Sequence, residues 1–476
     1  MMSSENENIV LFPFMAQGHI IPFMALALKL EQQTNYAITL INTPLNINRL
    51  KQNLPKHSAI RLLEIPFAGA ETTANIPGPL IRRLVETSAA LRPAFRDLVS
   101  RIQPICVISD IFFPWTAEAA REFNSRHAIF FAGGGFGMAG WAATSLNPVG
   151  STESDPDGFS MPGFLKGYVL QSKDLPETPT RRWKYGQEIF QGWKETDAML
   201  FNTMEEFDGI GLNYFRQNFP KCSVFAIGPI LNHEARRSPK EGENDTENNH
   251  DRCMEWLDSK PINSVLYVAF GSQNSPSDKQ TLELAKALEA SNVDFLWVLR
   301  PPSGSIMDFP DKDHFLPTGF VDRVRSSDKG LLVENWAPQM EILAHGSVGA
   351  FLSHCGWNST IEALSNGVPM LTWPIGADQP FNARFLEEEI GACVRVTSGG
   401  TSVVKCGEIV EKIELIMKSS DDGEGNVIRR KACEVKERIR EATYDERGWK
   451  GSSVKAMESF VNTFLQTRKV GKGFGT

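Results

Sequence analysis

The sequence predicts an α/β protein made of two Rossmann-like domains, each a doubly wound parallel sheet, that face each other across a cleft. Apolar runs of strand length alternate with longer amphipathic segments, the order typical of doubly wound sheets. The runs are apolar throughout, as expected of parallel strands that helices cover on both faces. A polar stretch, 233–252, divides the 476 residues into two such series, and this length exceeds that of one compact domain.

The first series predicts the N-terminal sheet. Strands are expected at 9–15, 37–43, 60–66, 105–110 and 128–132, and again within 197–207 and 223–230. Helical patterns cover 22–30 and 78–101, and a further helix is expected from Pro114. Residues 147–180 lose periodicity and gain Pro, Gly, Ser and Asp, which predicts a long loop.

The second series predicts the C-terminal sheet. Its strands are expected at 264–272, 295–300, 330–336, 348–354, 368–374 and 392–396, with a helix near 277–291, a loop at 301–326 and a helical tail from Lys405. We therefore expect an N-terminal domain over 1–232, a linker over 233–252 and a C-terminal domain over 253–445. The last residues, 446–476, are expected to form a helix that packs back on the N-terminal domain.

Composition limits the partners and the compartment. The net charge of −8 argues against a nucleic-acid partner, which needs a concentrated basic surface. The seven scattered cysteines, none in a CxxC pair, are typical of reduced thiols in a cytoplasmic protein. Residues 8–30 are apolar, but acidic residues precede them and Pro and Gly interrupt them, so we expect neither a signal peptide nor a membrane span.

His19 and Asp110 are candidate catalytic residues because each follows or ends a predicted strand. Ligand chemistry in doubly wound folds lies at the carboxyl ends of the strands. A neutral imidazole could take a proton from a hydroxyl, and a buried carboxylate could fix its tautomer. His19 could instead cap a helix or pack in the core, and Asp110 could cap the helix near Pro114. The pair requires that the two strand ends be neighbours, which the sequence leaves open.

Three other patterns have simpler interpretations. GFGMAG, 135–140, matches a dinucleotide fingerprint, but the expected ribose-binding acid is missing, which favours a tight strand-helix turn. Two DxD pairs, Asp155/Asp157 and Asp311/Asp313, could hold a divalent cation on a diphosphate. Both lie in polar loops, which favours solvated acids, and no histidine pair has zinc-ligand spacing. We therefore expect no metal and no cofactor.

The stretch 336–379 carries the parts needed to hold a nucleotide sugar. Trp336 offers a flat face on which a base can stack. The motif HCGWNS contains a glycine-flanked turn that opens a predicted helix, and such a helix start suits a diphosphate. Asp378 and Gln379 follow a predicted strand and could bind vicinal hydroxyls. Each residue alone has a structural alternative, but their combination favours a nucleotide-sugar site.

The stretch resembles the signature box of plant family-1 UDP-sugar glycosyltransferases. WAPQ, HCGWNS, Glu362 and the closing Asp-Gln pair all stand in the register of that 44-residue box (379 − 336 + 1 = 44). FPFMAQGHIIPFMALA, LFNTMEEF, FAIGP, VAFGS and FLWVLR are also similar to the family, so the resemblance covers nearly the whole chain. It implies a GT-B fold, an inverting mechanism and no metal.

The resemblance also implies a role for each matching residue. His19 would be the general base, and Asp110 would hold it and balance its charge. The expected donor-binding residues are Trp336 and the Ala337 backbone for uracil, Gln339 and Glu362 for ribose, Ser272, His354, Asn358 and Ser359 around Gly356 for the diphosphate, and Trp357, Asp378 and Gln379 for the sugar.

Two features of the sequence bear on the substrates. The resemblance implies that the closing Gln379, in place of a His, together with Trp357 favours UDP-glucose over UDP-galactose or a glucuronate donor. The family often carries Thr or Ser after the strand at 128–132, whereas AGGGFG, 132–137, has no hydroxyl, which leaves donor preference less defined. Aromatic residues suggest an apolar acceptor pocket, although core packing explains them equally well: Phe112, Phe113, Phe136 and Trp141.

The sequence therefore predicts a monomeric, cytoplasmic O-glucosyltransferase that uses UDP-glucose and forms β-glucosides of small lipophilic hydroxylated acceptors, which could be phenolics or flavonoids, phenylpropanoids, or terpenoids. Transfer of another UDP-sugar, or transfer to an existing glycoside, stays open. A nucleotide-sugar-binding protein without turnover and a nicotinamide-dependent oxidoreductase built on GFGMAG are the alternatives of another class.

Overall fold

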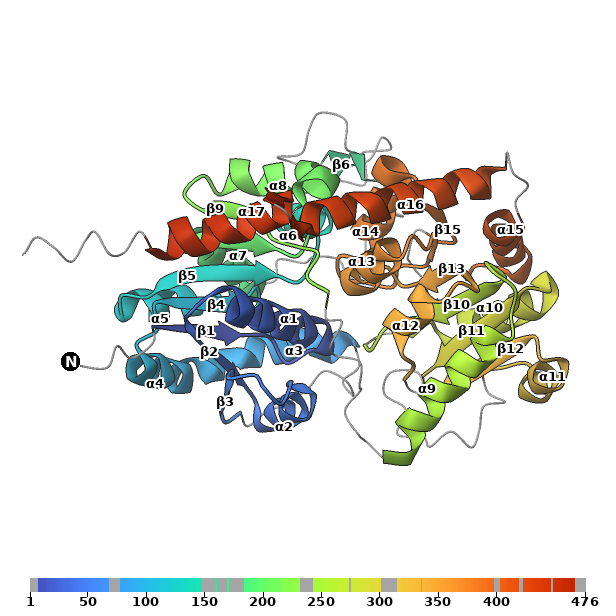
Figure 1. The fold of residues 1–476 in the computed structure, drawn as a ribbon, viewed down its shortest axis with the longest axis horizontal. Helices are drawn as coiled ribbons and strands as arrows, with labels where there is room; N and C mark the ends of the chain where they lie inside the picture. The colour runs from blue at the N-terminus through green and yellow to red at the C-terminus, as the bar shows by residue number, and fades with distance from the viewer. Residues whose placement is uncertain are drawn as a thin grey trace, which may run out of the picture.

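The structure is a computed structural model with two lobes, each built on a parallel sheet (Figure 1). It describes the residues in the following ranges: 7–67, 78–146, 159–160, 169–170, 184–231, 243–273, 275–300, 315–334, 336–397, 403–418, 423–446 and 448–466. Both sheets have helices on their faces, which confirms the predicted doubly wound architecture.

The N-terminal sheet has seven strands in the order β3-β2-β1-β4-β5-β8-β9, and every pairing is parallel. Its strands are β1 (Asn8–Phe12), β2 (Ala37–Asn42), β3 (Arg61–Glu64), β4 (Cys106–Asp110), β5 (Arg126–Phe131), β8 (Ala198–Phe201) and β9 (Ser223–Ala226). The central strands are buried on both faces, because apolar side chains point to the helices above and below.

Helices cover the two faces of this sheet. They are α1 (Gln17–Gln33), α2 (Pro44–Asn53), α3 (Gly78–Thr87), η1 (Ser88–Leu91), α4 (Arg92–Ile102), α5 (Thr116–Glu122), α6 (Gly135–Leu146), α7 (Lys184–Lys194) and α8 (Glu205–Asn218). The single helix expected over 78–101 is three pieces, because Pro93 at the start of α4 cannot continue a preceding helix regularly.

The C-terminal sheet has six parallel strands in the order β12-β11-β10-β13-β14-β15. Its strands are β10 (Val265–Ala269), β11 (Asp294–Leu299), β12 (Gly330–Glu334), β13 (Val348–Ser353), β14 (Met370–Thr372) and β15 (Cys393–Arg395). Its helices are α9 (Glu243–Asp258), α10 (Asp278–Ser291), α11 (Phe320–Ser327), α12 (Gln339–Ala344), α13 (Trp357–Ser365), α14 (Gln379–Phe385), η4 (Leu386–Ile390), α15 (Cys406–Met417) and α16 (Glu424–Thr443).

Three expected irregular segments contain regular structure. The stretch 301–326, predicted to be a loop, includes most of helix α11, which begins at Phe320. Helix α9 begins at Glu243, inside the stretch 233–252 that was predicted to be a linker. The prediction was wrong for 243–252 because a polar helix has no periodic apolar residues to indicate it. The stretch 147–180, predicted to be a loop, contains the short antiparallel strands β6 (Phe159–Ser160) and β7 (Val169–Leu170).

The residues up to 466 lead back to the N-terminal lobe. Helix α16 is followed by the hairpin β16 (Asp445–Glu446) and β17 (Trp449–Lys450), then by α17 (Ser452–Ser459) and the π-helical turn η5 (Phe460–Leu465). The rings of Phe460 and Phe225 on β9 lie 5.7 Å apart, so η5 packs on the edge of the N-terminal sheet. In Figure 1, α16 and α17 run as one red band across both lobes.

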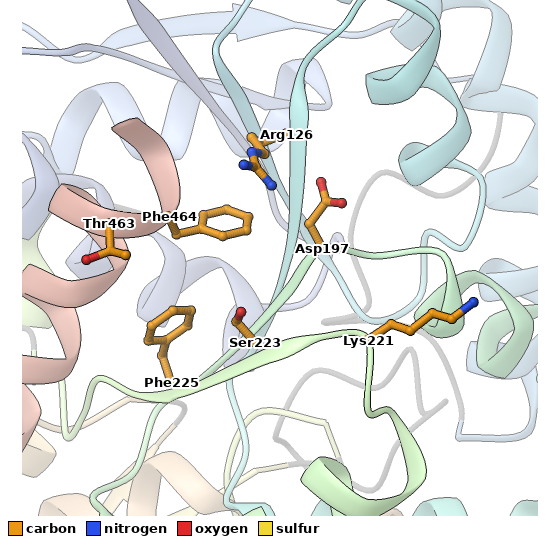
Figure 2. A pocket seen from close by; sticks show the side chains of 7 residues that line it. All are labelled: Arg126, Asp197, Lys221, Ser223, Phe225, Thr463 and Phe464. Carbon is orange, nitrogen blue, oxygen red and sulfur yellow. The ribbon is translucent and has the colours of Figure 1, made fainter. Parts of the chain in front are cut away.

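A cavity of about 260 Å³ lies where η5 meets the sheet (Figure 2). It is lined by Arg126, Asp197, Lys221, Ser223, Phe225, Thr463 and Phe464. Arg126 and Ser223 begin β5 and β9, so the cavity lies at the amino ends of the parallel strands. The candidate catalytic residues lie at the opposite, carboxyl ends, and the cavity is therefore separate from them.

Candidate active site

Two strands that end side by side bring His19 and Asp110 together. β1 and β4 are neighbours in the sheet, with Leu11 paired to Ile108. Asp110 is the last residue of β4, and His19 lies in the first turn of α1. His19 Nδ1 and Asp110 Oδ2 are 2.8 Å apart, and the carboxylate is fully buried whereas 24% of the imidazole side chain is exposed. The pairing that the sequence left open therefore exists, and the ring keeps Nε2 for a second partner.

The surroundings of His19 hold its ring in one orientation. The rings of Phe14 and Phe112 lie 5.8 Å and 5.5 Å from it, and the Phe112 N–H donates to the second oxygen of Asp110 at 3.2 Å. Burial lowers the pKa of His19, but the charge of Asp110, its hydrogen bond and the charge of Asp378 together raise the pKa above its usual value. The imidazole is thus a stronger base than a free histidine.

The HCGWNS turn joins β13 to α13 as the sequence predicts. Cys355 takes a left-handed conformation with φ of 65°, and its N–H donates to Ser353 Oγ at 3.2 Å. The His354 ring fits between Gly271 and Gly356, where a Cβ at either position would come within 2.6 Å of it. Burial and the charge of Arg300 lower the pKa of His354 to about 4, so its imidazole is neutral at neutral pH.

A polar network connects α12 with α13. The Gln339 amide donates to Ser359 Oγ at 3.0 Å and to Glu362 Oε2 at 2.6 Å, and it accepts from the Tyr267 hydroxyl at 3.2 Å. Burial raises the pKa of Glu362 to about 7, against the opposing effect of its bond to Gln339. Trp336 is half-buried just before α12. The structure thus brings Gln339, Ser359 and Glu362 of the predicted donor site together.

The acid-amide pair lies at the start of α14. Gln379 Oε1 accepts from the backbone N–H groups of Ile375 and Gly376, both at 2.9 Å, so its side chain is fixed. Burial raises the pKa of Asp378, while its bond to Asn382 and the charge of His19 lower it. A Cβ added to Gly133 just after β5 would lie 3.5 Å from Asp378 Oδ2, so this helix start faces the N-terminal lobe, and the charges of His19 and Asp378 affect each other's pKa.

Two hydrogen bonds join the donor-side turn to the N-terminal lobe. Asn358 Nδ2 donates to the Gly18 carbonyl at 2.8 Å, one residue before His19. The Trp357 indole N–H donates to the Asn202 carbonyl at 2.7 Å. Trp357 is 4% exposed, and a Cβ at Gly134 would lie 2.6 Å from its ring. Gly134 thus leaves room for this indole.

Two of the four predicted acceptor-pocket residues are in the core instead. Phe113 is 1% exposed and stacks on Phe12 with ring centres 4.3 Å apart. Phe136 is also 1% exposed and stacks on Phe385 of α14 at 5.1 Å. Neither ring offers surface to a ligand, because periodicity does not tell which side of a turn or helix start an aromatic faces. Phe112 and Trp141 are half-buried and lie 6.2 Å apart near His19, so the structure keeps them as candidates.

GFGMAG forms a strand-helix turn at the start of α6, as predicted. The N–H groups of Gly135 and Phe136 both donate to the carboxylate of Asp208, the bond from Phe136 measuring 2.8 Å. Burial raises the pKa of Asp208 to about 7, although these backbone bonds lower it. A carboxylate therefore occupies the helix start where a dinucleotide phosphate would bind, which argues against the nicotinamide alternative.

Sequence reasoning did not single out Asn202, Asn382 or Tyr267. Asn382 follows Asp378 by four residues, a spacing that places both on one face of a helix and that could have indicated the contact. Tyr267 lies in an apolar strand, and nothing in its pattern distinguishes it from a core residue. The DxD pairs lie outside the described residues. Within those residues, no three His, Cys, Asp or Glu side chains are grouped to hold a metal ion.

No helix in the described part of the chain is both long and apolar enough to span a membrane.

A family model described as UDP-glucoronosyl and UDP-glucosyl transferase matches residues 243–413. UDP-glycosyltransferase 92A1 of Arabidopsis thaliana is 42% identical to this chain, and the match covers 96% of this chain and 97% of the relative. Crocetin glucosyltransferase 3 of Crocus sativus is 36% identical, with coverage of 87% and 92%.

Solved structures agree with these relatives. UGT71G1 of Medicago truncatula, complexed with UDP-glucose, has a TM-score of 0.82 at 24% identity and covers 97% of this chain and 98% of its own. UGT2 of Phytolacca americana, complexed with UDP-2fluoro-glucose and pterostilbene, has a TM-score of 0.76 at 28% identity, with coverage of 97% and 100%. The chain therefore belongs to the plant UDP-glycosyltransferases and shares their GT-B fold.

Proposed function

We propose that this enzyme is an inverting O-glucosyltransferase that uses UDP-glucose and forms β-glucosides of small lipophilic alcohols or phenols. The observation that carries the proposal is the 2.8 Å contact between His19 and Asp110 beside a donor-side turn that reaches Gly18. A base with a raised pKa and an exposed edge next to a sugar-binding acid is the arrangement that direct displacement requires.

In the proposed mechanism, the acceptor hydroxyl lies between Nε2 of His19 and the anomeric carbon. Asp110 holds Nδ1, so Nε2 carries the lone pair that takes the proton as the oxygen attacks. The new bond forms on the face opposite UDP, and the bond from the anomeric carbon to the diphosphate breaks. One displacement converts the α-linked donor into a β-glucoside. The buried Asp110 carboxylate stabilises the imidazolium that results.

The leaving diphosphate would be held at the start of α13. Backbone N–H groups there carry partial positive charge, and His354 adds a neutral ring whose Nδ1 has no hydrogen-bond partner among the described residues. These groups would stabilise the charge that develops on UDP without a divalent cation, so we propose that transfer needs no metal. Activity that survives an excess of chelator is the expected result, and loss of activity restored by Mg²⁺ or Mn²⁺ would contradict it.

The deciding experiment mixes the enzyme with UDP-glucose and a panel of phenols, flavonoids, phenylpropanoids and terpenoid alcohols. UDP release is measured, and the anomeric configuration of each product is read from its proton NMR coupling. Acceptor-dependent UDP release and β-linked products are expected. Donor binding without release on any acceptor would instead favour a nucleotide-sugar-binding protein, and an α-linked product would overturn the single displacement.

The acceptor class is proposed from the pocket and from the relatives together. Phe112 and Trp141 form an aromatic wall beside His19, which suits a flat or lipophilic acceptor. Among the relatives are a crocetin glucosyltransferase, an anthocyanin 3'-O-beta-glucosyltransferase of Gentiana triflora and a scopoletin glucosyltransferase of Nicotiana tabacum. These names support conjugated aromatic or polyene acceptors, and transfer to an existing glycoside is the second candidate that the same panel tests.

Replacing Trp336 with alanine is expected to raise the KM for UDP-glucose by about 5- to 150-fold, since base stacking contributes about 1–3 kcal/mol. The kcat at saturating donor should change much less, because the uracil lies away from the reacting atoms. Initial rates against donor concentration measure both. Trp449→Ala is the matched control, because that indole is 51% exposed on the β16–β17 hairpin. An unchanged donor KM in Trp336→Ala would rule out the stacking role.

Gln379→His is expected to lower kcat/KM for UDP-glucose by about tenfold and to move donor preference toward UDP-galactose. The side-chain oxygen Oε1 of Gln379 accepts from two backbone N–H groups, which leaves the side-chain NH₂ group as a donor for a sugar hydroxyl. One ring nitrogen of histidine cannot reproduce both bonds, so the side chain loses its fixed orientation at a cost of about 1–2 kcal/mol. Competing the two donors against each other measures the preference, with Gln187→His on the exposed face of α7 as control. An unchanged preference would contradict the donor assignment.

A further inference from the structure

Asn382 on α14 joins two parts of the proposed donor site through one amide group. The side chain is completely buried. Its Nδ2 donates to Asp378 Oδ2 at 2.9 Å and to the Cys355 carbonyl at 3.0 Å. The acid proposed to bind the sugar and the turn proposed to hold the diphosphate are thereby fixed relative to each other.

The remaining face of Asn382 is closed by α6 of the other lobe. Its Oδ1 has no hydrogen-bond partner in the described part of the chain, and a Cβ added to Gly137 would overlap this oxygen. One turn later, a Cβ at Gly140 would lie 2.5 Å from the ring of Phe381. The second and third glycines of GFGMAG therefore allow α6 to approach α14 closely, and Gly137 leaves Asn382 its space.

The charge of Asp378 depends on this arrangement. Burial raises the pKa of Asp378, and the Asn382 bond is the largest of the contributions that lower it again, followed by a backbone bond and the charge of His19. His19 and the buried thiol of Cys355 are the titratable groups that face the carboxylate. An ionised, oriented carboxylate accepts from two vicinal hydroxyls, whereas a protonated one accepts less well and also donates.

We propose that Asn382 is a positioning residue for the transferred sugar: it orients the Asp378 carboxylate, and the glycine face of α6 keeps Asn382 in place. The inference rests on the proposed role of Asp378 in sugar binding. It assigns GFGMAG a function that differs from phosphate binding, because the motif supports the sugar site from the opposite lobe. Sugar affinity is then coupled to the contact between the lobes.

The first test replaces Asn382 with leucine, which has a similar volume and no donor. Calorimetric titration should show UDP-glucose binding weakened by about tenfold or more, because a hydrogen bond to a charged group is lost. The affinity for UDP, which lacks the sugar, should stay within about twofold, because the Cys355 N–H bond to Ser353 and the Asn358 bond to Gly18 still hold the turn. Asn218→Leu on α8 is the control for the substitution itself, since this exposed amide donates to the Tyr214 carbonyl within its own helix.

The second test reads the pH dependence of sugar binding. It uses a His19→Ala background, in which that imidazole no longer titrates. Glu362, whose pKa is about 7, also titrates in the proposed donor site, but it would bind the ribose of UDP and of UDP-glucose alike. The ratio of UDP-glucose to UDP affinity is therefore measured, and it should fall as Asp378 becomes protonated at acidic pH. Without the Asn382 bond the pKa of Asp378 is higher, so the loss in Asn382→Leu should begin at a higher pH. A residue with a purely structural role would weaken binding equally at every pH.

The third test acts from the other lobe. Gly137→Ala places a methyl group against Asn382 Oδ1 and should reproduce the sugar-selective loss, although Gly137 belongs to the lobe opposite the proposed donor site. Gly209→Ala on α8 is the control, because its Cβ would meet nothing closer than 3.8 Å. In the double variant with Asn382→Leu, the loss of binding free energy for UDP-glucose should be smaller than the sum of the two single losses, since both substitutions act on one contact.

The outcomes separate the inference from the function on which it rests. Unchanged UDP-glucose affinity in Asp378→Ala would overturn the proposed sugar site itself. Loss in Asp378→Ala together with unchanged affinity in Asn382→Leu and Gly137→Ala would overturn only the positioning role. Equal loss of UDP and UDP-glucose in both variants would also overturn it, because the effect would not be specific to the sugar. If Asn382→Leu fails to fold, Gly137→Ala decides alone.

Discussion

Replacing His19 with alanine is expected to lower kcat by roughly 10²- to 10⁴-fold, the contribution typical of a general base. The acceptor hydroxyl then loses the group that takes its proton, and water cannot occupy the same position with the same basicity. UDP affinity should stay within about twofold, because the nucleotide contacts proposed for Trp336, Gln339 and Glu362 belong to the other lobe. Single-turnover rates and a UDP titration measure the two quantities separately.

The design of this experiment needs a histidine control and a rescue. His57→Ala removes an exposed imidazole on the same lobe and should leave kcat unchanged. Added imidazole should restore part of the lost rate in His19→Ala, since the deleted ring leaves space beside Phe14 and Phe112. Full activity of His19→Ala on a phenol would refute the base assignment, and a parallel loss of UDP affinity would show that the variant disturbs the fold instead.

Most of the fold could be predicted because both sheets consist of buried parallel strands. Runs such as 105–110 and 348–354 are apolar on both faces, and the observed strands β4 and β13 lie within them. The structure of the linker was harder to predict, since α9 begins in a stretch, 233–252, whose sequence contains no Val, Ile, Leu or Met. Its polar side chains carry no periodic apolar signal, and a helix of that kind looks like irregular chain in composition.

The candidate site could be predicted where local motifs define it and not where packing does. The contact between His19 and Asp110 depends on β1 and β4 being neighbours, and strand order is a property of the whole sheet. Phe112 and Phe113 are adjacent in sequence, yet one faces His19 and the other stacks on Phe12. Which of them turns inward follows from the tertiary packing around the end of β4, which neighbouring sequence does not encode by itself.

Asp110→Asn is expected to reduce kcat by about as much as the loss of His19, roughly 10²- to 10⁴-fold, although the base itself remains. Asparagine can still accept the Phe112 N–H, so the turn after β4 should keep its shape. Its NH₂ group, however, faces Nδ1 and donates to it, which leaves the proton on Nε2. The imidazole then points a proton, and not a lone pair, at the acceptor hydroxyl.

The pH profile distinguishes this mechanism from simple loss of packing. In the native enzyme the charge and hydrogen bond of Asp110 raise the pKa of His19. The rate should therefore rise with pH as His19 loses its proton, and this rise should occur at a higher pH than for an ordinary histidine. Removing that charge lets burial lower the pKa, and the limb of kcat in Asp110→Asn should move to lower pH while the plateau falls. Asp97→Asn on the exposed side of α4 should change neither quantity. A limb that stays in place, or moves to higher pH, would mean that Asp110 does not set the basicity of His19.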